Sequence, residues 1–158
     1  MQILRPLPPV TRPLNSMVET LTLEIITPSR SMLNETVDSV TIPGESGELG
    51  IMPGHTPLIS NLKTGVLSYT KSGNTVRLLV SGGFVEVGDD RVAVLADVAE
   101  RADEIDVAAA RQSREGAERV LAQLSGETID HETAQNDFDL ASTRLQLVSG
   151  DPSATPTR

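Results

Sequence analysis

Residues 43–58 read PGESGELGIMPGHTPL, and this stretch separates segments with different patterns. Four glycines and three prolines in sixteen positions exclude a helix and argue against one uninterrupted strand. Its apolar residues are spaced to anchor a turn-rich loop onto a core: Leu49, Ile51, Met52 and Leu58. This leaves Glu45, Glu48 and His55 as a polar tip. A loop of this kind suits a surface that another protein contacts.

Short strand patterns lie on both sides of this loop. Over residues 19–27, apolar Leu21, Leu23 and Ile25 alternate with other side chains, and a turn is predicted over residues 29–34. Further strand-like runs cover residues 37–42, 65–70, 75–80, 84–87 and 91–96. Aromatic residues make up only 2% of the chain, so the core must be aliphatic. These patterns predict an N-terminal all-β antiparallel sandwich or barrel.

The periodicity becomes helical after Ile105. Asp106 is a suitable N-cap, Ser125-Gly126 is expected to end the first helix, and a second helix should run from near Asp130 to Gly150. The short link predicts a C-terminal antiparallel α-helical hairpin. Its predicted seam consists of Val107, Ala110, Ala117, Leu121 and Leu124 in the first helix and Ala134, Phe138, Ala141, Leu145 and Val148 in the second.

Four of the ten seam residues are alanines, which limits the hydrophobic stabilisation of the hairpin. Ordering some forty residues carries a large entropic cost, so the isolated hairpin should be marginally stable. It therefore needs the sandwich or another protein to pack against. Two alternative docking surfaces would make it a switch.

The patterns divide the chain into four parts. Residues 1–17 are rich in proline and predict a flexible arm without a signal peptide, although Met17 as the true start is an equal alternative. A β-sandwich domain follows over residues 18–103 and the helical hairpin over 104–149. Residues 150–158 are expected to form a disordered tail.

Composition and spacing exclude several classes of function. The net charge of −9 disfavours nucleic acid and anionic membrane surfaces as direct partners. Residues 100–144 hold 11 acids and 5 arginines, a net charge of −6, which suggests a basic partner for the hairpin. There is no cysteine, and His55 and His131 lack metal-ligand spacing. Ser81-Gly82-Gly83 is no nucleophile elbow, so we expect neither an enzyme nor a cofactor.

Several motifs together resemble one family. They are Leu21–Ile25, Val37–Val40, Gly47–Gly50, Pro53–Leu58, Val80–Val87, Val94–Ala96 and Glu104–Asp106. In this order, followed by a helical hairpin, they resemble the epsilon subunit of the rotary F-type ATP synthase. The resemblance covers roughly residues 20–148 and is specific in combination, whereas each motif alone is weak.

The resemblance implies a non-catalytic subunit of the central stalk, with its sandwich bound to the gamma subunit and seated on the c-ring. It assigns Glu48 to the c-ring contact and His55 to the gamma contact. The alternative is that Glu48 is a solvated turn acid and His55 a hydrogen-bonding loop residue. The implied location is peripheral, on the cytoplasmic face of the bacterial inner membrane, with membrane contact only through the complex. Whether the coupling ion is a proton or sodium stays open.

In this family the hairpin can enter the alpha/beta catalytic head and oppose ATP hydrolysis, and some members bind ATP in the folded hairpin. Glu100, Asp106 and Arg144 match the ATP motif, but Ala109 and Leu140 replace two arginines. We therefore expect weak or no ATP binding, and weak inhibition because the second helix is not basic. The alternative function is a non-enzymatic adaptor that displays a helical hairpin to another protein.

Overall fold

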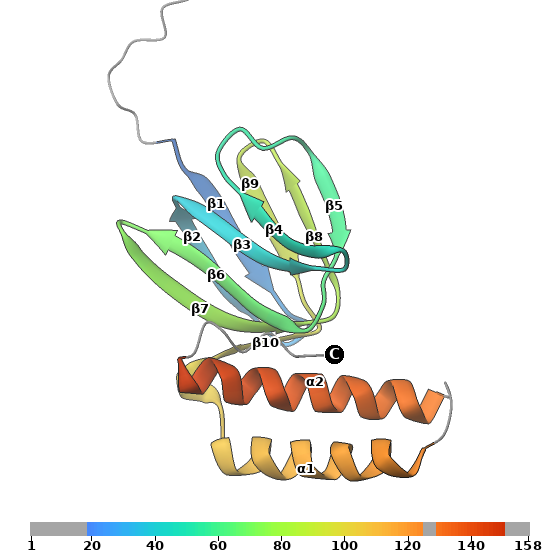
Figure 1. Cartoon of the computed structure of the whole chain (residues 1–158). Coiled ribbons are helices and arrows are strands. Elements are labelled where there is room, and N and C mark those ends of the chain that lie inside the picture. The colour runs from blue at the N-terminus through green and yellow to red at the C-terminus, as the bar shows by residue number, and fades with distance from the viewer. Residues whose placement is uncertain (1–18, 125–128, 151–158) are drawn as a thin grey trace, which may run out of the picture.

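The structure is a computed structural model that describes residues 19–124 and 129–150, and it contains a β-sandwich followed by a helical hairpin (Figure 1). The strands are β1 (Leu21–Ile26), β2 (Ser31–Val37), β3 (Ser39–Gly44), β4 (Gly47–Ile51), β5 (Leu58–Asn61), β6 (Gly65–Lys71), β7 (Asn74–Ser81), β8 (Phe84–Gly88), β9 (Arg91–Leu95) and β10 (Val98–Arg101). A 3-10 turn, η1 (Ala102–Glu104), leads to α1 (Val107–Gln123) and α2 (Ile129–Ser149). The arm, Ser125-Gly126 and residues 151–158 of the tail lie outside the described residues.

The strands form two five-stranded sheets. The first sheet has the order β2-β1-β9-β8-β5, and the second has the order β10-β7-β6-β3-β4. Every pair is antiparallel except β1 with β9, which run parallel. The predicted sandwich is therefore confirmed, with one parallel pair that local patterns could not reveal. Its core lies between the sheets and is almost entirely aliphatic, with Tyr69 as its one aromatic member among the described residues.

The central stretch contains more strand than the sequence suggested. Strand β3 continues to Gly44, and a two-residue turn connects it to β4. Pro43 is tolerated because pairing of β3 with β6 ends at Thr41. Ile51 is buried, and Leu49 and Leu58 pack against the core. Met52 does not anchor the loop, because it is 65% exposed.

The sequence analysis missed parts of other strands. Strand β2 occupies most of the predicted turn over residues 29–34, and β10 follows the last predicted strand. Both are edge strands, each paired with one neighbour only. Their pairing with β1 and β7 decides their conformation, and a local pattern does not report such pairing.

Two glycines carry the chain from one sheet to the other. Gly82 and Gly83 have φ values of 68° and 84°, and they connect β7 of the second sheet to β8 of the first. A Cβ at Gly83 would overlap the carbonyl oxygen of Leu95. The backbone geometry of this connection between the sheets thus accounts for the two glycines that follow Ser81.

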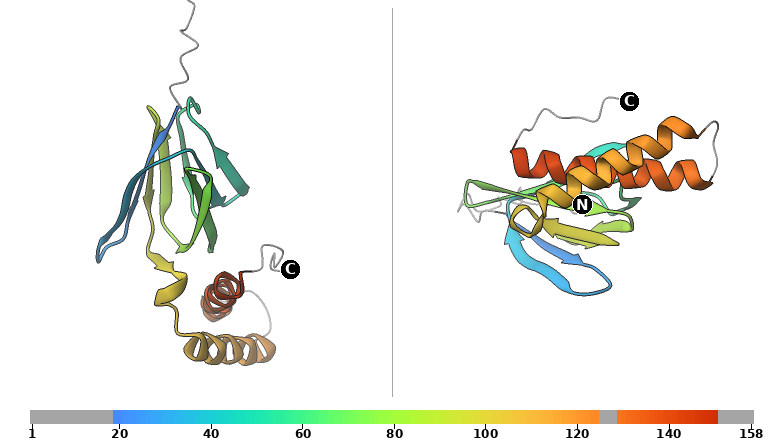
Figure 2. Two further views of the ribbon diagram at one scale, coloured as in Figure 1. Left: turned by 90° about the vertical axis from the view of Figure 1, so that its left-hand side faces the viewer. Right: turned by 90° about the horizontal axis from the view of Figure 1, so that it is seen from below.

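The hairpin lies on the outer face of the second sheet. Helix α2 lies between α1 and the sandwich, as the left view of Figure 2 shows with α2 almost end-on. Ala110 and Ala117 of α1 and Ala134 and Ala141 of α2 are buried, which permits close approach of the helices. None of the described helices is long and apolar enough to cross a membrane.

The predicted seam differs from the structure at its last position. Val148 is 40% exposed, whereas Leu147, one residue earlier, is buried. Leu147 lines a recess together with Val66 of the second sheet. Helix α2 therefore buries two faces, one against α1 and one against the sheet. A single heptad seam accounts for only the first of these faces.

An ion pair fixes η1 on the sandwich. Arg30, in the turn between β1 and β2, donates to both carboxylate oxygens of Glu104 at 2.7 and 2.9 Å. The Arg101 backbone N–H also donates to Glu104, at 2.8 Å. The hydrogen bonds from Arg30 and Arg101 lower the pKa of Glu104 from 4.5 to about 2.

This lowered pKa predicts an acid-dependent contribution to stability. Because the pKa is lower in the folded chain, the ionised Glu104 stabilises the fold above pH 4.5, and this contribution is lost as the pH falls toward 2. Glu104→Gln should lower the free energy of unfolding by about 1 kcal/mol at pH 6, after screening by solvent, and by much less at pH 3. Urea unfolding at both values measures this difference, with Glu118→Gln on α1 as the control. Equal losses at both pH values would contradict it.

Candidate functional site

The Pro53-Gly54-His55 turn is tied to a neighbouring turn of the sandwich. The His55 N–H donates to the Met52 carbonyl at 3.1 Å, and the Gly54 N–H donates to Asp90 Oδ1 at 2.6 Å. His55 Nδ1 lies 2.7 Å from the Thr56 carbonyl oxygen. Asp90 belongs to the turn between β8 and β9. The half-buried His55 is therefore presented by a fixed turn at one end of the sandwich.

Apolar side chains point outward from the first sheet, whereas the hairpin packs on β6 and β7 of the second sheet. The register places Ile26 opposite Leu95 and Leu95 opposite Phe84. Ile59, on the adjacent edge strand β5, is 72% exposed, and Phe84 is 41% exposed. We call Ile26, Leu95, Phe84 and Ile59 the outer row. Ile26 is half-buried, and Ile59 lies opposite Glu86, diagonal to Phe84. Exposed apolar side chains on neighbouring strands of one sheet indicate a protein contact surface.

The sequence analysis did not find the outer row. Alternation indicates that each strand has two faces, but it does not show which outward residues of different strands become neighbours. Phe84 and Ile59 are 25 positions apart in the chain. The only available signal was the presence of large apolar residues at outward positions of strands.

Glu48 lies in β4 and is exposed, as a surface contact would require. It lines a recess of about 300 Å³ together with Arg77 of β7 and Gln146 and Leu147 of α2. The end of the docked hairpin therefore lies beside the strand that carries Glu48. His55 belongs to a different end of the sandwich, so the structure does not bring these two predicted contact residues together.

Two of the three residues of the ATP-like motif form an ion pair. Arg144 Nε and Nη2 donate to the Glu100 carboxylate at 2.8 and 2.6 Å. The hydrogen bonds to Glu100 raise the pKa of Arg144, against the opposing effect of burial. Asp106 instead caps α1 by accepting a hydrogen bond from the Ala109 N–H at 3.0 Å.

The small recess around this motif has the wrong charge for a triphosphate. Its volume is about 220 Å³, and its ionisable lining residues are Glu100, Glu104, Asp106 and Arg144. Three acids therefore face one arginine, which Glu100 already engages. Anions bind where hydrogen-bond donors and positive charge are free, and this lining offers little of either.

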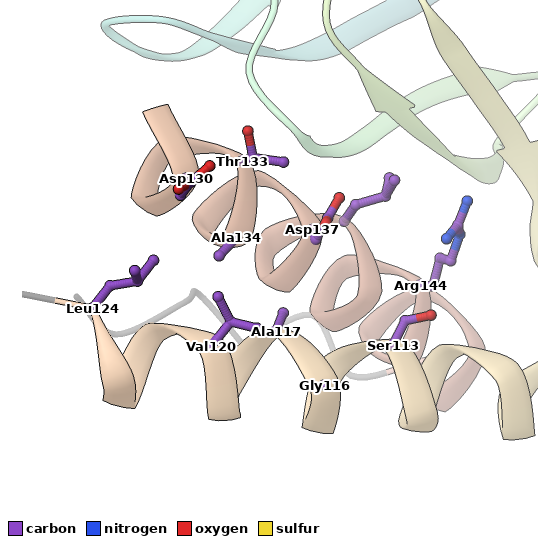
Figure 3. Close-up of a pocket in the computed structure, with 11 residues that line it drawn as sticks. Ser113, Gly116, Ala117, Val120, Leu124, Asp130, Thr133, Ala134, Asp137 and Arg144 are labelled. Atoms are coloured by element: carbon purple, nitrogen blue, oxygen red, sulfur yellow. The ribbon is translucent and has the colours of Figure 1, made fainter. Parts of the chain in front are cut away.

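A larger cleft of about 660 Å³ lies between the two helices (Figure 3). Ala117 and Val120 of α1 point toward Ala134 of α2 across this cleft. Asp130, Asp137 and Arg144 also line it, so charged side chains of both signs accompany its apolar residues. Within residues 19–124 and 129–150, no group of three or more His, Asp or Glu side chains is placed to hold a metal ion.

Two family profiles cover nearly all of the described chain. Residues 20–102 match the profile described as "ATP synthase, Delta/Epsilon chain, beta-sandwich domain". Residues 103–149 match the one described as "ATP synthase, Delta/Epsilon chain, long alpha-helix domain". The boundary between these matches falls inside η1, between the last strand and the first helix.

Similar proteins carry the same description. An ATP synthase epsilon chain of Nitratidesulfovibrio vulgaris is 45% identical over 131 residues, which are 83% of this chain and 97% of the relative. One of Geobacter sulfurreducens is 41% identical over 132 residues, with coverage of 84% and 96%.

Solved structures show the same fold. A chain of the Euglena gracilis mitochondrial ATP synthase (OSCP/F1/c-ring) aligns with a TM-score of 0.69 and 23% identity, over 79% of each chain. A chain of the Tetrahymena thermophila mitochondrial ATP synthase (central stalk/c-ring) aligns with a TM-score of 0.59 and 18% identity, over 81% of this chain and 96% of that one. On the profiles and the bacterial relatives, this chain belongs to the family of ATP synthase delta/epsilon chains.

Proposed function

We propose that this chain is a rotor subunit of the central stalk, which couples rotation of the c-ring to ATP synthesis through the gamma subunit. The observation that carries this proposal is the outer row, in which Ile59, Phe84 and Leu95 stay exposed while the hairpin is docked. The relatives named ATP synthase epsilon chain support it, as does a neighbour from an assembly described as central stalk and c-ring. The chain itself is a non-catalytic subunit of the complex.

The gamma subunit is the partner that we assign to the outer row. Phe84 at its centre is the large aromatic side chain that a protein interface can bury, with Leu95 and Ile26 beside it. Ile59 extends this surface along β5, the strand that follows His55. This arrangement supports a gamma contact that includes His55, and it adds four residues to the one suggested by the sequence.

The c-ring is the partner that we assign to Glu48. Its carboxylate is exposed on the short hairpin of β3 and β4, where it can reach polar groups of a neighbouring protein. The sandwich would then contact gamma through one sheet and the ring through the other. Such a subunit lies peripherally at the cytoplasmic face of the bacterial inner membrane and meets the membrane only through the complex.

The hairpin is the part that we expect to act on hydrolysis. When it leaves the sheet, its helices can extend toward the alpha/beta head and act as a brake. The described part of α2 contains Asp130, Glu132, Asp137 and Asp139 against one arginine, Arg144. This acidic character disfavours binding to other acidic surfaces and supports a weak brake.

The outer row predicts the result of a binding experiment. Phe84→Asp places a charge at the centre of the apolar surface and should weaken binding to a complex of gamma with the catalytic head by roughly 30-fold or more. Thr36→Asp, at an exposed position of the opposite edge strand β2, is the control. Isothermal titration calorimetry or surface plasmon resonance measures the affinity of each variant. Unchanged binding of a folded Phe84→Asp variant would remove the outer row from the interface.

Truncation separates the two proposed activities. We expect the full chain to lower ATP hydrolysis by a head-and-gamma complex modestly, and a chain ended at Ala102 to bind without lowering it. Steady-state hydrolysis and co-purification give both readouts. Binding of both forms with no inhibition would leave the hairpin without a braking role, and binding of neither would favour the adaptor function.

The charge of the recess predicts weak or absent ATP binding. Three acids and a paired arginine should keep the dissociation constant above about 1 mM, which corresponds to less than about 4 kcal/mol of binding free energy. Calorimetry with MgATP and the free chain measures this constant. Leu140→Arg, which adds an arginine to the interhelical cleft, should tighten binding if missing charge is the cause. A low micromolar constant for the natural sequence would overturn this prediction.

A further inference from the structure

We propose that two ion pairs with separate roles control the hairpin. Arg30–Glu104 is a clamp that fixes η1 to the sandwich, and Glu100–Arg144 is a latch that holds α2 on the sheet. Between them, Ile105 and Asp106 form the hinge. The inference deepens the proposed function and rests on it for its purpose, because a brake requires release of the hairpin. The two ion pairs themselves are properties of the free chain.

The clamp joins parts that all precede the hairpin. Arg30 lies between β1 and β2, and Arg101, whose N–H binds Glu104, ends β10. Arg30 Nη2 also lies 3.5 Å from the Ala99 carbonyl oxygen of β10. Because none of these groups belongs to α1 or α2, removal of the hairpin from the sheet leaves every one of these contacts in place. The moving part therefore begins after Glu104.

The latch joins the hairpin to the sheet. Arg144 is on α2 and Glu100 is on β10, and their side chains are only 26% and 23% exposed. Leu79 of β7 lies opposite Glu100 in the register of the second sheet. It is fully buried, although it points away from the sandwich core. Undocking of α2 would separate the two charges and expose Leu79 to water. The paired guanidinium thus stabilises the docked position in a partly shielded environment, where charge pairs are screened less than at the surface.

The hinge is the extended segment between the clamp and α1. Ile105 has φ and ψ of −89° and 124°, and Asp106 has −81° and 105°. Asp106 accepts its capping hydrogen bond from Ala109, which moves with α1. Rotation about these two residues therefore keeps the cap of α1 and the clamp on Glu104. The packing of α1 is mainly on α2, so the two helices can leave the sheet together.

The absence of cysteine from the sequence allows this inference to be tested with spin labels on the full-length free chain. Labels at Asn74 of β7 and Asn136 of α2, both exposed, report the distance between sheet and hairpin by double electron–electron resonance. A second pair, Asn74 with the exposed Asp103 of η1, reports whether the clamp holds. Each variant also needs an unchanged circular dichroism spectrum, which shows that the sandwich is folded.

The matched variants are Arg144→Gln for the latch and Arg30→Gln for the clamp, since each removes one arginine and one ion pair. Arg144→Gln should raise the population with long Asn74–Asn136 distances roughly tenfold and leave the Asn74–Asp103 distance unchanged. Arg30→Gln should broaden the distribution of Asn74–Asp103 distances. It should release α2 to a smaller extent than Arg144→Gln does. Added salt should release the hairpin of the natural chain only modestly, because the pair is partly shielded, and still less in Arg144→Gln, which has no pair to screen.

A charge exchange separates pairing from packing. The double variant Glu100→Arg with Arg144→Glu should restore docking that Arg144→Glu alone loses. Failure of Arg144→Gln to change the distances, or equal release by Arg30→Gln, would overturn the proposal. Because no gamma subunit or catalytic head is present, this result does not depend on the proposed brake. A chain that releases its hairpin as predicted but does not inhibit hydrolysis would contradict only the proposed function.

Discussion

The packing of α2 against the second sheet is the interaction that organises the molecule. Helix α2 receives α1 on one side and covers Leu79 on the other, while Arg144 pairs with Glu100 at the margin of the contact. Without this contact, the helices would pack only on each other, and the four alanines buried between them contribute little apolar surface. The position of the hairpin therefore depends on a helix that has two buried faces.

This packing also divides the surface of the sandwich into two parts. The second sheet is occupied by the hairpin, whereas the first sheet carries the outer row and remains accessible. The outer row and the surface that α2 covers belong to different sheets, and Ile59, Phe84 and Leu95 stay exposed while the hairpin is docked.

The three residues that match the ATP motif all make contacts within the chain. Arg144 is bound by Glu100, and Asp106 is bound to the backbone of α1. With Ala109 and Leu140 at the two arginine positions, the acids around this site exceed the cations. The Glu100–Arg144 pair thus joins α2 to the second sheet beside this recess.

Some features depend only on residues that are close in the chain, and these could be predicted from local patterns. They are the strands with strict alternation, the turns at Gly73 and Asp89-Asp90, the cap at Asp106 and the existence of a helical hairpin. The combined motifs of the sequence also indicated the family. Other features depend on contacts between distant parts of the chain. They are the parallel pairing of β1 with β9, the edge strands β2 and β10, the outer row and the burial of Leu147 in place of Val148. The Arg30–Glu104 and Glu100–Arg144 pairs join residues 74 and 44 positions apart. Periodicity reports which face of an element is buried, but only packing decides which distant element covers it.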